Sequence, residues 1–278
     1  DWSGPDDRPY VTLTNPLSAE RAAMRHSLLA SVLDITTTNS RYQERLALFE
    51  VGPVFIVDED EVLPAEQTRL SMVLSGQRTV SGWQTGNPGT FDFFDLKGVL
   101  EALFNELHLS IRYEPVQHPT YRPGRTARLL LGENQVGVMG ELHPLVVEQF
   151  DLQFEENQPV LAADIDLDAL LAHVPSHYPY DPISPYPAVH EDIAVVVDKE
   201  VTAVAVEEVI RNSGGYLLKD VALFDLYEGD QIGSGKKSLA YHLTFQAPDK
   251  TLTDKVVQKS RNKIIGQLRH RLNAKLRE

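Results

Sequence analysis

The hydrophobic and polar positions of residues 221–254 alternate in a way that predicts two β-strands followed by a helix. Successive side chains of a strand point to opposite faces of its sheet. The first strand would therefore place Ala222, Phe224 and Leu226 on one face and Leu223, Asp225 and Tyr227 on the other. In the second strand, Leu239, Tyr241, Leu243 and Phe245 alternate with Ser238, Ala240, His242 and Thr244. The pattern predicts a hairpin with one apolar face to be covered and one polar face left open.

The elements around this hairpin complete a small domain. The pattern predicts a strand, a helix, a second helix and a short last strand at residues 192–197, 202–212, 253–272 and 274–277. Gly214 and Gly215 would end the first helix, and Asn273 suits a left-handed C-terminal position after the second. Thr251 and Asp254 are spaced as a capping box. The order βαββαβ is the ferredoxin-like motif, in which two helices cover one sheet face and leave the other open.

The preceding part of the chain predicts an α+β domain. A helix is expected from Ser18, its N-cap, with Arg21 at the capping-box position and with apolar residues at 24, 28, 32 and 35. Strands, helices and a hairpin then follow at residues 46–57, 70–75, 93–107, 128–139 and 160–165, with a short helix after Pro144. Because strands and helices do not alternate regularly, an antiparallel sheet flanked by helices is expected.

A proline-rich segment separates the two parts. Residues 173–187 contain five prolines in fifteen positions, which excludes a helix or a central strand. We therefore expect one domain at residues 1–174, a stiff linker at 175–187 and a second domain at 188–278. The chain does not begin with Met, so we expect a piece of a longer protein.

Composition narrows the class of protein. The apolar fraction of 42% fits folded domains, no apolar run is long enough to predict a membrane span, and the absence of Cys fits a cytoplasmic protein. The net charge of −14 is unevenly distributed, because residues 250–278 carry nine Lys and Arg against two acidic residues. An open polar sheet face beside a basic helix is typical of an RNA-binding domain. The alternatives are an ordinary half-solvated hairpin and a solvated basic helix face.

Catalytic signatures are missing from the sequence. There is no phosphate-binding loop, no dinucleotide fingerprint and no His pair at metal-ligand spacing, so no catalytic residue and no metal ligand is predicted. The loop at 233–237 (GSGKK) joins two antiparallel strands and favours a hairpin connection. Arg122 and Arg125 lie on a tight turn that could hold an anion, although salt bridges within this acidic domain are the stronger expectation. His143, before Pro144, is expected to be structural.

Several segments, in order, resemble the bacterial phenylalanyl-tRNA synthetase beta subunit. They are LTNPLSAERAAMRHSLL (13–29), LFEVGPVF (48–55), FDLKGVLEALF (94–104), RPGRTARLLLGENQVGVMGELHP (122–144), VLAADIDLDALL (160–171), YPAVHEDIAVVVD (186–198), LFDLYEGDQIGSGKKSLAYHLTFQAPDKTLTD (223–254) and the final LNAKLRE. The match covers nearly the whole chain and points to the C-terminal part of that subunit.

The resemblance implies a fold and a function. The first domain would be a class II synthetase-like core without catalysis that packs on a catalytic alpha subunit, and the second would be a ferredoxin-fold anticodon-binding domain. The family's enzyme is a heterotetramer of two alpha and two beta subunits that charges tRNA-Phe with the help of ATP and Mg²⁺; no cofactor is expected in this segment itself. The Gly-rich segment that closes a class II ATP site does not occur here.

The resemblance also implies site residues. Asp225, Tyr227 and Ser238 fall where the family touches the anticodon. A carboxylate can accept both N–H groups of guanine, the first anticodon base expected, and a tyrosine can stack on a base. Where the family usually has a basic pair, this chain has His190 and Glu191, so phosphate contacts are expected from His190, Lys236, Lys237, Lys255 and Lys259. The alternative is a non-catalytic paralogue that acts as a ligand-sensing or protein-interaction module.

Overall fold

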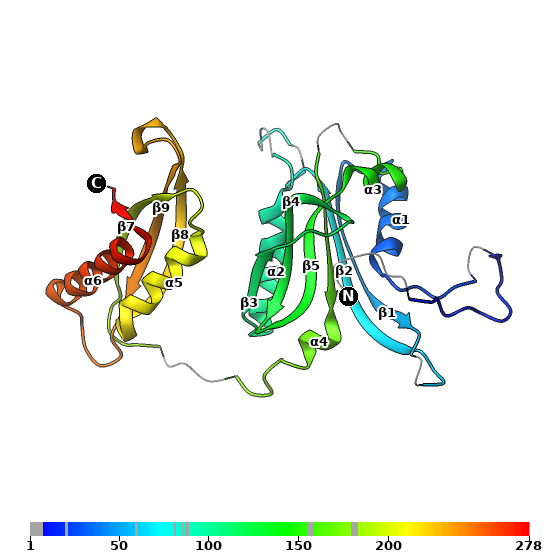
Figure 1. Cartoon of the computed structure of the whole chain (residues 1–278), viewed down its shortest axis with the longest axis horizontal. Helices are drawn as coiled ribbons and strands as arrows, with labels where there is room; N and C mark the ends of the chain where they lie inside the picture. Colours follow the sequence, from blue (N-terminus) through cyan, green and yellow to red (C-terminus); the bar gives the residue numbers. More distant parts are fainter. Residues whose placement is uncertain are drawn as a thin grey trace. The chain divides into compact units, whose positions relative to one another are not determined.

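The chain divides into two compact units, Asp1–Tyr178 and Pro179–Glu278. The computed structural model describes residues 8–19, 22–58, 61–80, 82–84, 86, 89–154, 158–178 and 183–277. Figure 1 labels the elements of both units, which are described one at a time below. Residues 179–182 of the predicted linker and Arg21 of the predicted capping box lie outside the described residues.

The first unit is built on a six-stranded antiparallel sheet. Its strand order is β1-β2-β6-β5-β4-β3, and every neighbouring pair is antiparallel. The strands are β1 (Arg45–Ile56), β2 (Ala65–Gly76), β3 (Ile111–Pro115), β4 (Tyr121–Leu131), β5 (Asn134–Leu142) and β6 (Val160–Asp166). The predicted antiparallel sheet with flanking helices is therefore confirmed.

Helices cover both faces of this sheet. They are α1 (Leu29–Ser40), α2 (Phe93–Glu106), α3 (Pro144–Gln149) and α4 (Leu167–Leu171). On one face, α2 packs against sheet residues such as Leu129 and Met139. On the other, α1 packs against Val73 and Val138. Because Val138 and Met139 are consecutive in β5, the alternation of a strand supplies both cores from one sequence segment.

The first helix begins later than its sequence pattern predicts. It starts at Leu29 rather than near Ser18, and its N-cap, Leu28, makes no side-chain cap hydrogen bond. The preceding segment is extended and pairs with itself: the Leu13 N–H donates to the Ala22 carbonyl, and that of Met24 to the Val11 carbonyl, each at 2.8 Å. The prediction of a helix from Ser18 was wrong because backbone pairing in an extended segment competes with a periodic apolar pattern.

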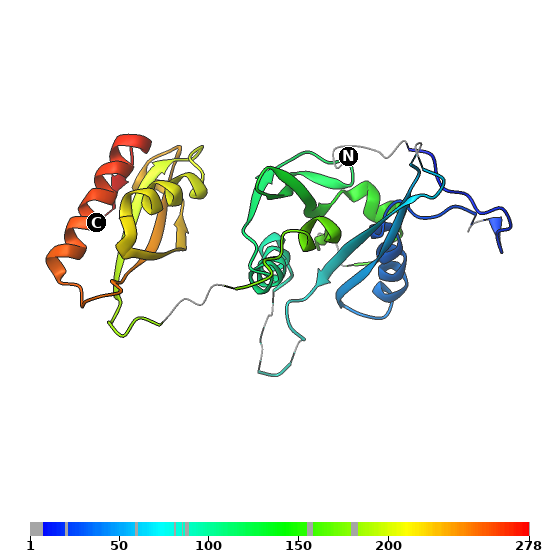
Figure 2. The same cartoon turned by 90° about the horizontal axis from the view of Figure 1, so that it is seen from below.

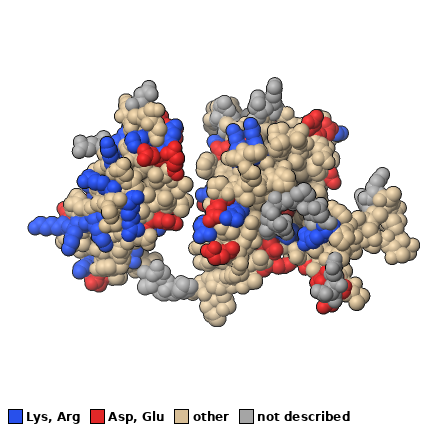
Figure 3. All heavy atoms as spheres, in the orientation of Figure 1, with Lys and Arg blue, Asp and Glu red and all other residues tan. Residues whose placement is uncertain are grey.

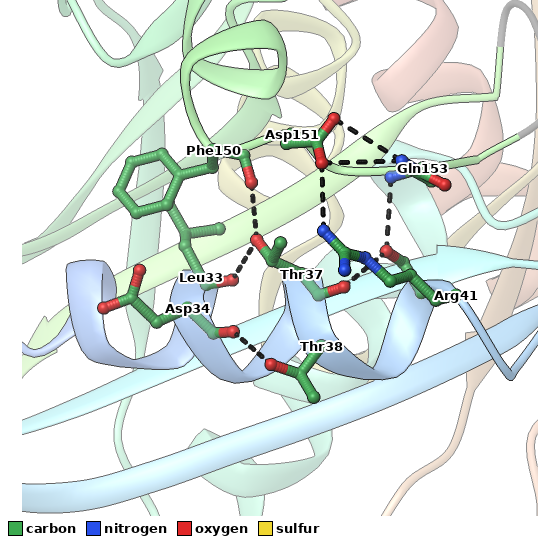
Figure 4. A network of polar contacts seen from close by, with 9 residues as sticks. Leu33, Asp34, Thr37, Thr38, Arg41, Phe150, Asp151 and Gln153 are labelled. Atoms are coloured by element: carbon green, nitrogen blue, oxygen red, sulfur yellow. Dashed lines mark hydrogen bonds and ion pairs between the residues drawn. The ribbon is translucent and has the colours of Figure 1, made fainter.

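Polar contacts fasten the end of α1 to the turn after α3 (Figure 4). The Thr37 hydroxyl lies 2.7 Å from the Phe150 carbonyl oxygen, and the Gln153 N–H donates to the Ser40 hydroxyl at 3.2 Å. Arg41 pairs with Asp151 at 3.1 Å. Asp151 has a φ of 52°, a left-handed conformation that Asp tolerates better than most residues. These contacts hold the chain where it turns from α3 toward the next strand.

The second unit has the βαββαβ order of the ferredoxin-like fold. Its elements are β7 (Val189–Asp198), α5 (Ala203–Gly214), β8 (Leu218–Tyr227), β9 (Lys236–Phe245), α6 (Asp254–Leu272) and β10 (Lys275–Leu276). The sheet order is β10-β7-β9-β8, and all pairs are antiparallel. The prediction of this motif is confirmed, and β8 and β10 are the two edges of the sheet.

The ends of the two helices follow the sequence in part. Gly215 ends α5 with a φ of 71°, and Asn273 ends α6 in the left-handed conformation, both as predicted. The capping box expected from Thr251 and Asp254 is not formed, because Thr253 is the N-cap and makes no side-chain cap hydrogen bond.

Both helices pack on one face of the second sheet. They lie side by side (Figures 1 and 2). The shared core contains Val206 and Ile210 of α5, Ile264 of α6, and Tyr241 and Leu243 of β9. The Tyr241 hydroxyl donates to the Ala203 carbonyl at 3.0 Å, which satisfies its buried polar group. No helix of the described part of the unit covers the opposite face, so that face is the open one.

Candidate nucleic-acid interface

The register of β8 against β9 defines the open face. Residues that lie opposite one another in an antiparallel pair share a face. Tyr227 lies opposite Ser238, and Asp225 lies opposite Ala240. Leu226 lies opposite the fully buried Leu239 and so belongs to the core face. Asp225, Tyr227 and Ser238 are therefore brought together on the open face.

A bulge in β8 breaks the strict alternation expected from the sequence. The register shifts between Leu223 and Asp225, which leaves Phe224 without an opposite residue. Leu223 lies opposite the core residue Tyr241, whereas Phe224 stacks on His242, a residue of the open face. The prediction that Phe224 shares the covered face with Leu226 was wrong, since a bulge inserts one extra residue and re-aims the side chains around it.

Asp225 presents an available carboxylate. The residue is exposed, and no described side chain pairs with it. It lies on an edge strand, so a partner can approach it without displacing another strand. Ser238 is different: only 3% of it is exposed, because it lies in the middle of the sheet between Tyr227 and Val196.

The ring of Tyr227 is contacted by Arg277 and lies close to the backbone of Gly229. The Arg277 guanidinium lies 4.6 Å from the ring centroid, a cation–π contact. Arg277 follows β10, and its N–H donates to the Ala194 carbonyl at 2.8 Å. Since β7 and β9 separate β10 from β8, the contact crosses the open face over Ser238. At the hydroxyl end, a Cβ added to Gly229 would collide with the Tyr227 oxygen. The ring is therefore positioned before a ligand binds. The same contact covers Ser238.

The predicted phosphate contacts do not form one patch. Lys236 pairs with Asp198 at 2.6 Å at one end of the open face. His190 lies at the other end, with its Nδ1 3.2 Å from the Thr244 hydroxyl. Lys237 alternates with Lys236 along β9 and is half-buried.

The basic helix lies behind the sheet. Lys255 and Lys259 are exposed on α6, which packs against the face opposite Asp225. In Figure 3, Lys and Arg side chains gather over α6, whereas acidic and basic side chains are mixed over the rest of the visible second unit. The sequence predicted a basic helix beside the open face. In the structure, the helix lies on the opposite side of the sheet.

Four residues of this face were not selected from the sequence. Phe224 and His242 stack with centroids 3.8 Å apart, and Asp192 lies 2.5 Å from Nδ1 of His242. Arg277 was counted only as part of the basic run. The positions of His242 and Asp192 on polar strand faces were visible in the sequence, but their pairing depends on the β7–β9 register.

The arginine pair of the first unit is engaged internally. Arg122 and Arg125 bind the two oxygens of Glu141 at 2.7 and 2.5 Å. Only 10% of the Glu141 side chain is exposed, against 46% for Arg122 and 56% for Arg125. The expectation of salt bridges rather than an anion site is confirmed. His143 is structural as predicted, since its Nδ1 accepts the Leu145 N–H at the start of α3.

At the start of α2, a charged group caps the helix. Asp92 and Asp95 form a reciprocal capping box, and Arg78 pairs with both, at 2.5 and 2.8 Å. Burial by itself would raise the pKa of Asp95. The hydrogen bond and charge of Arg78, together with the Asp92 N–H, outweigh burial and lower this pKa below its ordinary value of 3.8.

The described residues offer neither a metal site nor a membrane span. No group of three or more His, Asp or Glu side chains there could hold a metal ion. No helix there is long and apolar enough to cross a membrane.

Comparison with known families defines the class of protein. Residues 184–277 match the ferredoxin-fold anticodon binding domain, which contains the open face described above. Residues 2–167 match the phenylalanyl tRNA synthetase beta chain CLM domain. The fold and these matches define a two-domain segment of an aminoacyl-tRNA synthetase subunit.

Curated relatives give the particular family. The chain is 38% identical to the phenylalanine–tRNA ligase beta subunit of Clostridium tetani, 36% to that of Listeria monocytogenes and 37% to that of Bacillus subtilis. The alignments cover 98%, 98% and 96% of this chain and 33% of each relative. The chain belongs to the phenylalanyl-tRNA synthetase beta chain family, as its sequence predicts, and spans about a third of the length of these relatives.

Proposed function

We propose that the second unit reads the anticodon of tRNA-Phe through the open face of its sheet. The observation that carries this proposal is the exposed Asp225 carboxylate, which no described side chain engages, beside the pre-positioned ring of Tyr227. A carboxylate there can accept the N1 and N2 hydrogens of guanine, and the ring can stack on the base. Ser238 would become available only if the Tyr227 ring moves.

The electrostatics support a base rather than a phosphate at Asp225. A phosphate would be repelled by the free carboxylate, whereas guanine offers two hydrogen-bond donors to it. Phosphates would instead be met at the ends of the face, by the Lys236 ammonium at one end and the His190 imidazole at the other. Lys255 and Lys259 can serve only an RNA segment that reaches behind the sheet.

We propose that the first unit is a non-catalytic scaffold for a catalytic alpha subunit, in a cytoplasmic heterotetramer of two alpha and two beta chains. Large apolar side chains on its surface support a docking role, since they include Phe49, Trp83 and Phe94 with 72%, 93% and 75% exposed. The holoenzyme would use ATP and Mg²⁺ to charge tRNA-Phe, and both would be held outside this segment.

The test is a base-selectivity measurement. Binding of the 278-residue chain to a short RNA hairpin with loop bases GAA is compared with binding to the same hairpin carrying AAA, at fixed salt. Asp225→Asn should lose about 1–3 kcal/mol of preference for guanine, because the amide replaces one of the two acceptor oxygens with an NH2 donor that faces a guanine N–H. Asp249→Asn makes the same charge change on an exposed loop and should leave the preference intact.

Two results would overturn the proposal. Equal binding of both hairpins by the wild-type chain would exclude base reading, and would favour a ligand-sensing or protein-interaction role. An equal loss of guanine preference in Asp225→Asn and Asp249→Asn would mean that the change in net charge, and not the position of Asp225, causes the loss.

A further inference from the structure

The bulge in β8 creates a second aromatic surface on the open face. Phe224 stacks on His242 with an interplanar angle of 12° and a centroid separation of 3.8 Å. Half of Phe224 is exposed, at 50%, even though the ring is already in contact with the imidazole. The free side of this ring is therefore available to a flat partner.

Contacts below the ring fix its position. His242 lies on β9, and its Nδ1 is 2.5 Å from the Asp192 carboxylate on β7. Asp192 is also the residue opposite His242 in the strand register. Three neighbouring strands thus contribute one residue each: the Asp192 carboxylate binds the His242 imidazole, and the Phe224 ring stacks on that imidazole. Such support orients the aromatic surface before a ligand arrives and reduces the entropy lost on binding.

The hollow beside this stack is acidic. It is lined by His190, Glu191, Asp192, Asp220, Ala222 and His242. Asp220 lies opposite Thr244 and so shares the open face. Glu191 lies opposite the core residue Leu243 and pairs with Arg261 of α6 at 3.4 Å, so Asp192 and Asp220 supply the carboxylates on the open face, the latter 3.7 Å from Arg211. Two carboxylates on this face disfavour a phosphate group there. The hollow favours a planar ring that carries an amino group, because carboxylates accept hydrogen bonds from exocyclic amines.

This stack is distinct from the Tyr227 site. Along β9, Tyr227 lies opposite Ser238, whereas the stack is centred on His242, four residues further on. At about 3.4 Å per residue, the two aromatic sites are roughly 14 Å apart. Stacked bases are only about 3.4 Å apart, so one continuous stack of neighbouring bases cannot occupy both sites.

We propose that Phe224, supported by His242 and Asp192, is a second base-stacking site that holds an adenine of the anticodon loop unstacked from the base at Asp225. The inference rests on the proposed anticodon-reading function and deepens it. The phenyl ring would stack on the adenine, and the carboxylates of the hollow would accept hydrogen bonds from its 6-amino group. The bulge is the structural feature that makes this site possible.

The experiment uses 2-aminopurine, a fluorescent base that keeps the purine ring of adenine but carries its amino group at C2 instead of C6 and so reports stacking alone, placed in turn at the second and third loop positions of the GAA hairpin. On binding of the wild-type chain, one of these two positions should be quenched by stacking. Phe224→Leu should abolish the quenching at that position and weaken binding by roughly 5-fold to 150-fold, the range found for loss of one base–aromatic stack. Phe224→Tyr should retain both signals. Tyr42→Leu, which removes an aromatic ring that is 80% exposed in the first unit, should alter neither.

The outcomes distinguish a failure of the Phe224 stacking site from a failure of anticodon reading. If Asp225→Asn loses guanine preference while Phe224→Leu leaves both adenine positions quenched, the second site is wrong and anticodon reading stands. If the wild-type chain does not discriminate the first base, the proposed function itself fails. Replacement of both adenines by unsubstituted purine, which lacks only the 6-amino group, tests the carboxylates: undiminished affinity would contradict the role of the acidic hollow. The circular dichroism spectrum of Phe224→Leu must match that of the wild-type chain, which shows that the variant folds. If the spectra differ, the test rests on Phe224→Tyr, and a loss of quenching in that variant would contradict the second site.

Discussion

Removal of the two arginines around Glu141 should destabilise the first unit far more than removal of the carboxylate they bind. Only 10% of the Glu141 side chain is exposed, whereas Arg122 and Arg125 are 46% and 56% exposed. If the arginines are lost, a buried charge remains unpaired. If the carboxylate is neutralised, the guanidinium groups regain contact with water.

The magnitudes follow from this asymmetry. Arg122→Met combined with Arg125→Met should lower the free energy of unfolding by about 3–5 kcal/mol, the cost of a buried charge without a partner. Glu141→Gln retains one acceptor and should cost only about 1–2 kcal/mol. Arg41→Met removes an exposed pair with Asp151 and should cost at most about 1 kcal/mol.

Urea unfolding followed by circular dichroism gives these free energies, and hydrogen exchange of β4 and β5 localises the change to the first unit. A Glu141→Gln variant that is as unstable as the double arginine variant would refute the reasoning. So would a double variant with wild-type stability, since the arginines would then be free for an external anion.

Two further predictions concern single contacts. Gly229→Ala should weaken the guanine preference of the GAA hairpin, because the new methyl group would displace the Tyr227 ring; Gly266→Ala, at a glycine of α6 with nothing within 4 Å, is the control and should not weaken it. The lowered pKa of Asp95 stabilises the fold above its unfolded value of 3.8, and this contribution should be lost as pH falls through the lower folded value. Asp95→Asn should therefore flatten the acid limb of a stability–pH curve, and an unchanged limb would contradict the assignment.

Much of the fold could be predicted from the sequence because apolar periodicity and element order are local signals. The βαββαβ order required only strand and helix patterns and two helix ends, at Gly215 and Asn273. The start of α1 failed for the opposite reason. Backbone pairing between residues near Val11 and Met24 is a tertiary feature, and an apolar spacing of three and four does not reveal it.

The candidate site shows the same division. Asp225 and Tyr227 share a face because they are two residues apart, which the sequence displays directly. The burial of Ser238 and the contact between Tyr227 and Arg277 depend on which strands are neighbours, so they could not be predicted. The position of Phe224 depends on a single unpaired residue, and no residue type in β8 marks it.

The bulge also determines what kinds of sequence change the open face can tolerate. Substitutions in an exposed edge strand are usually mild, and most side chains of β8 face solvent. A change in length is different, because loss of one residue between Ala222 and Tyr227 would either remove the bulge or turn Asp225 and Tyr227 toward the helices. In this lineage the residue count of β8 should therefore stay fixed while its side chains drift, except at Phe224, Asp225 and Tyr227, a signature of selection on register as well as on these three side chains.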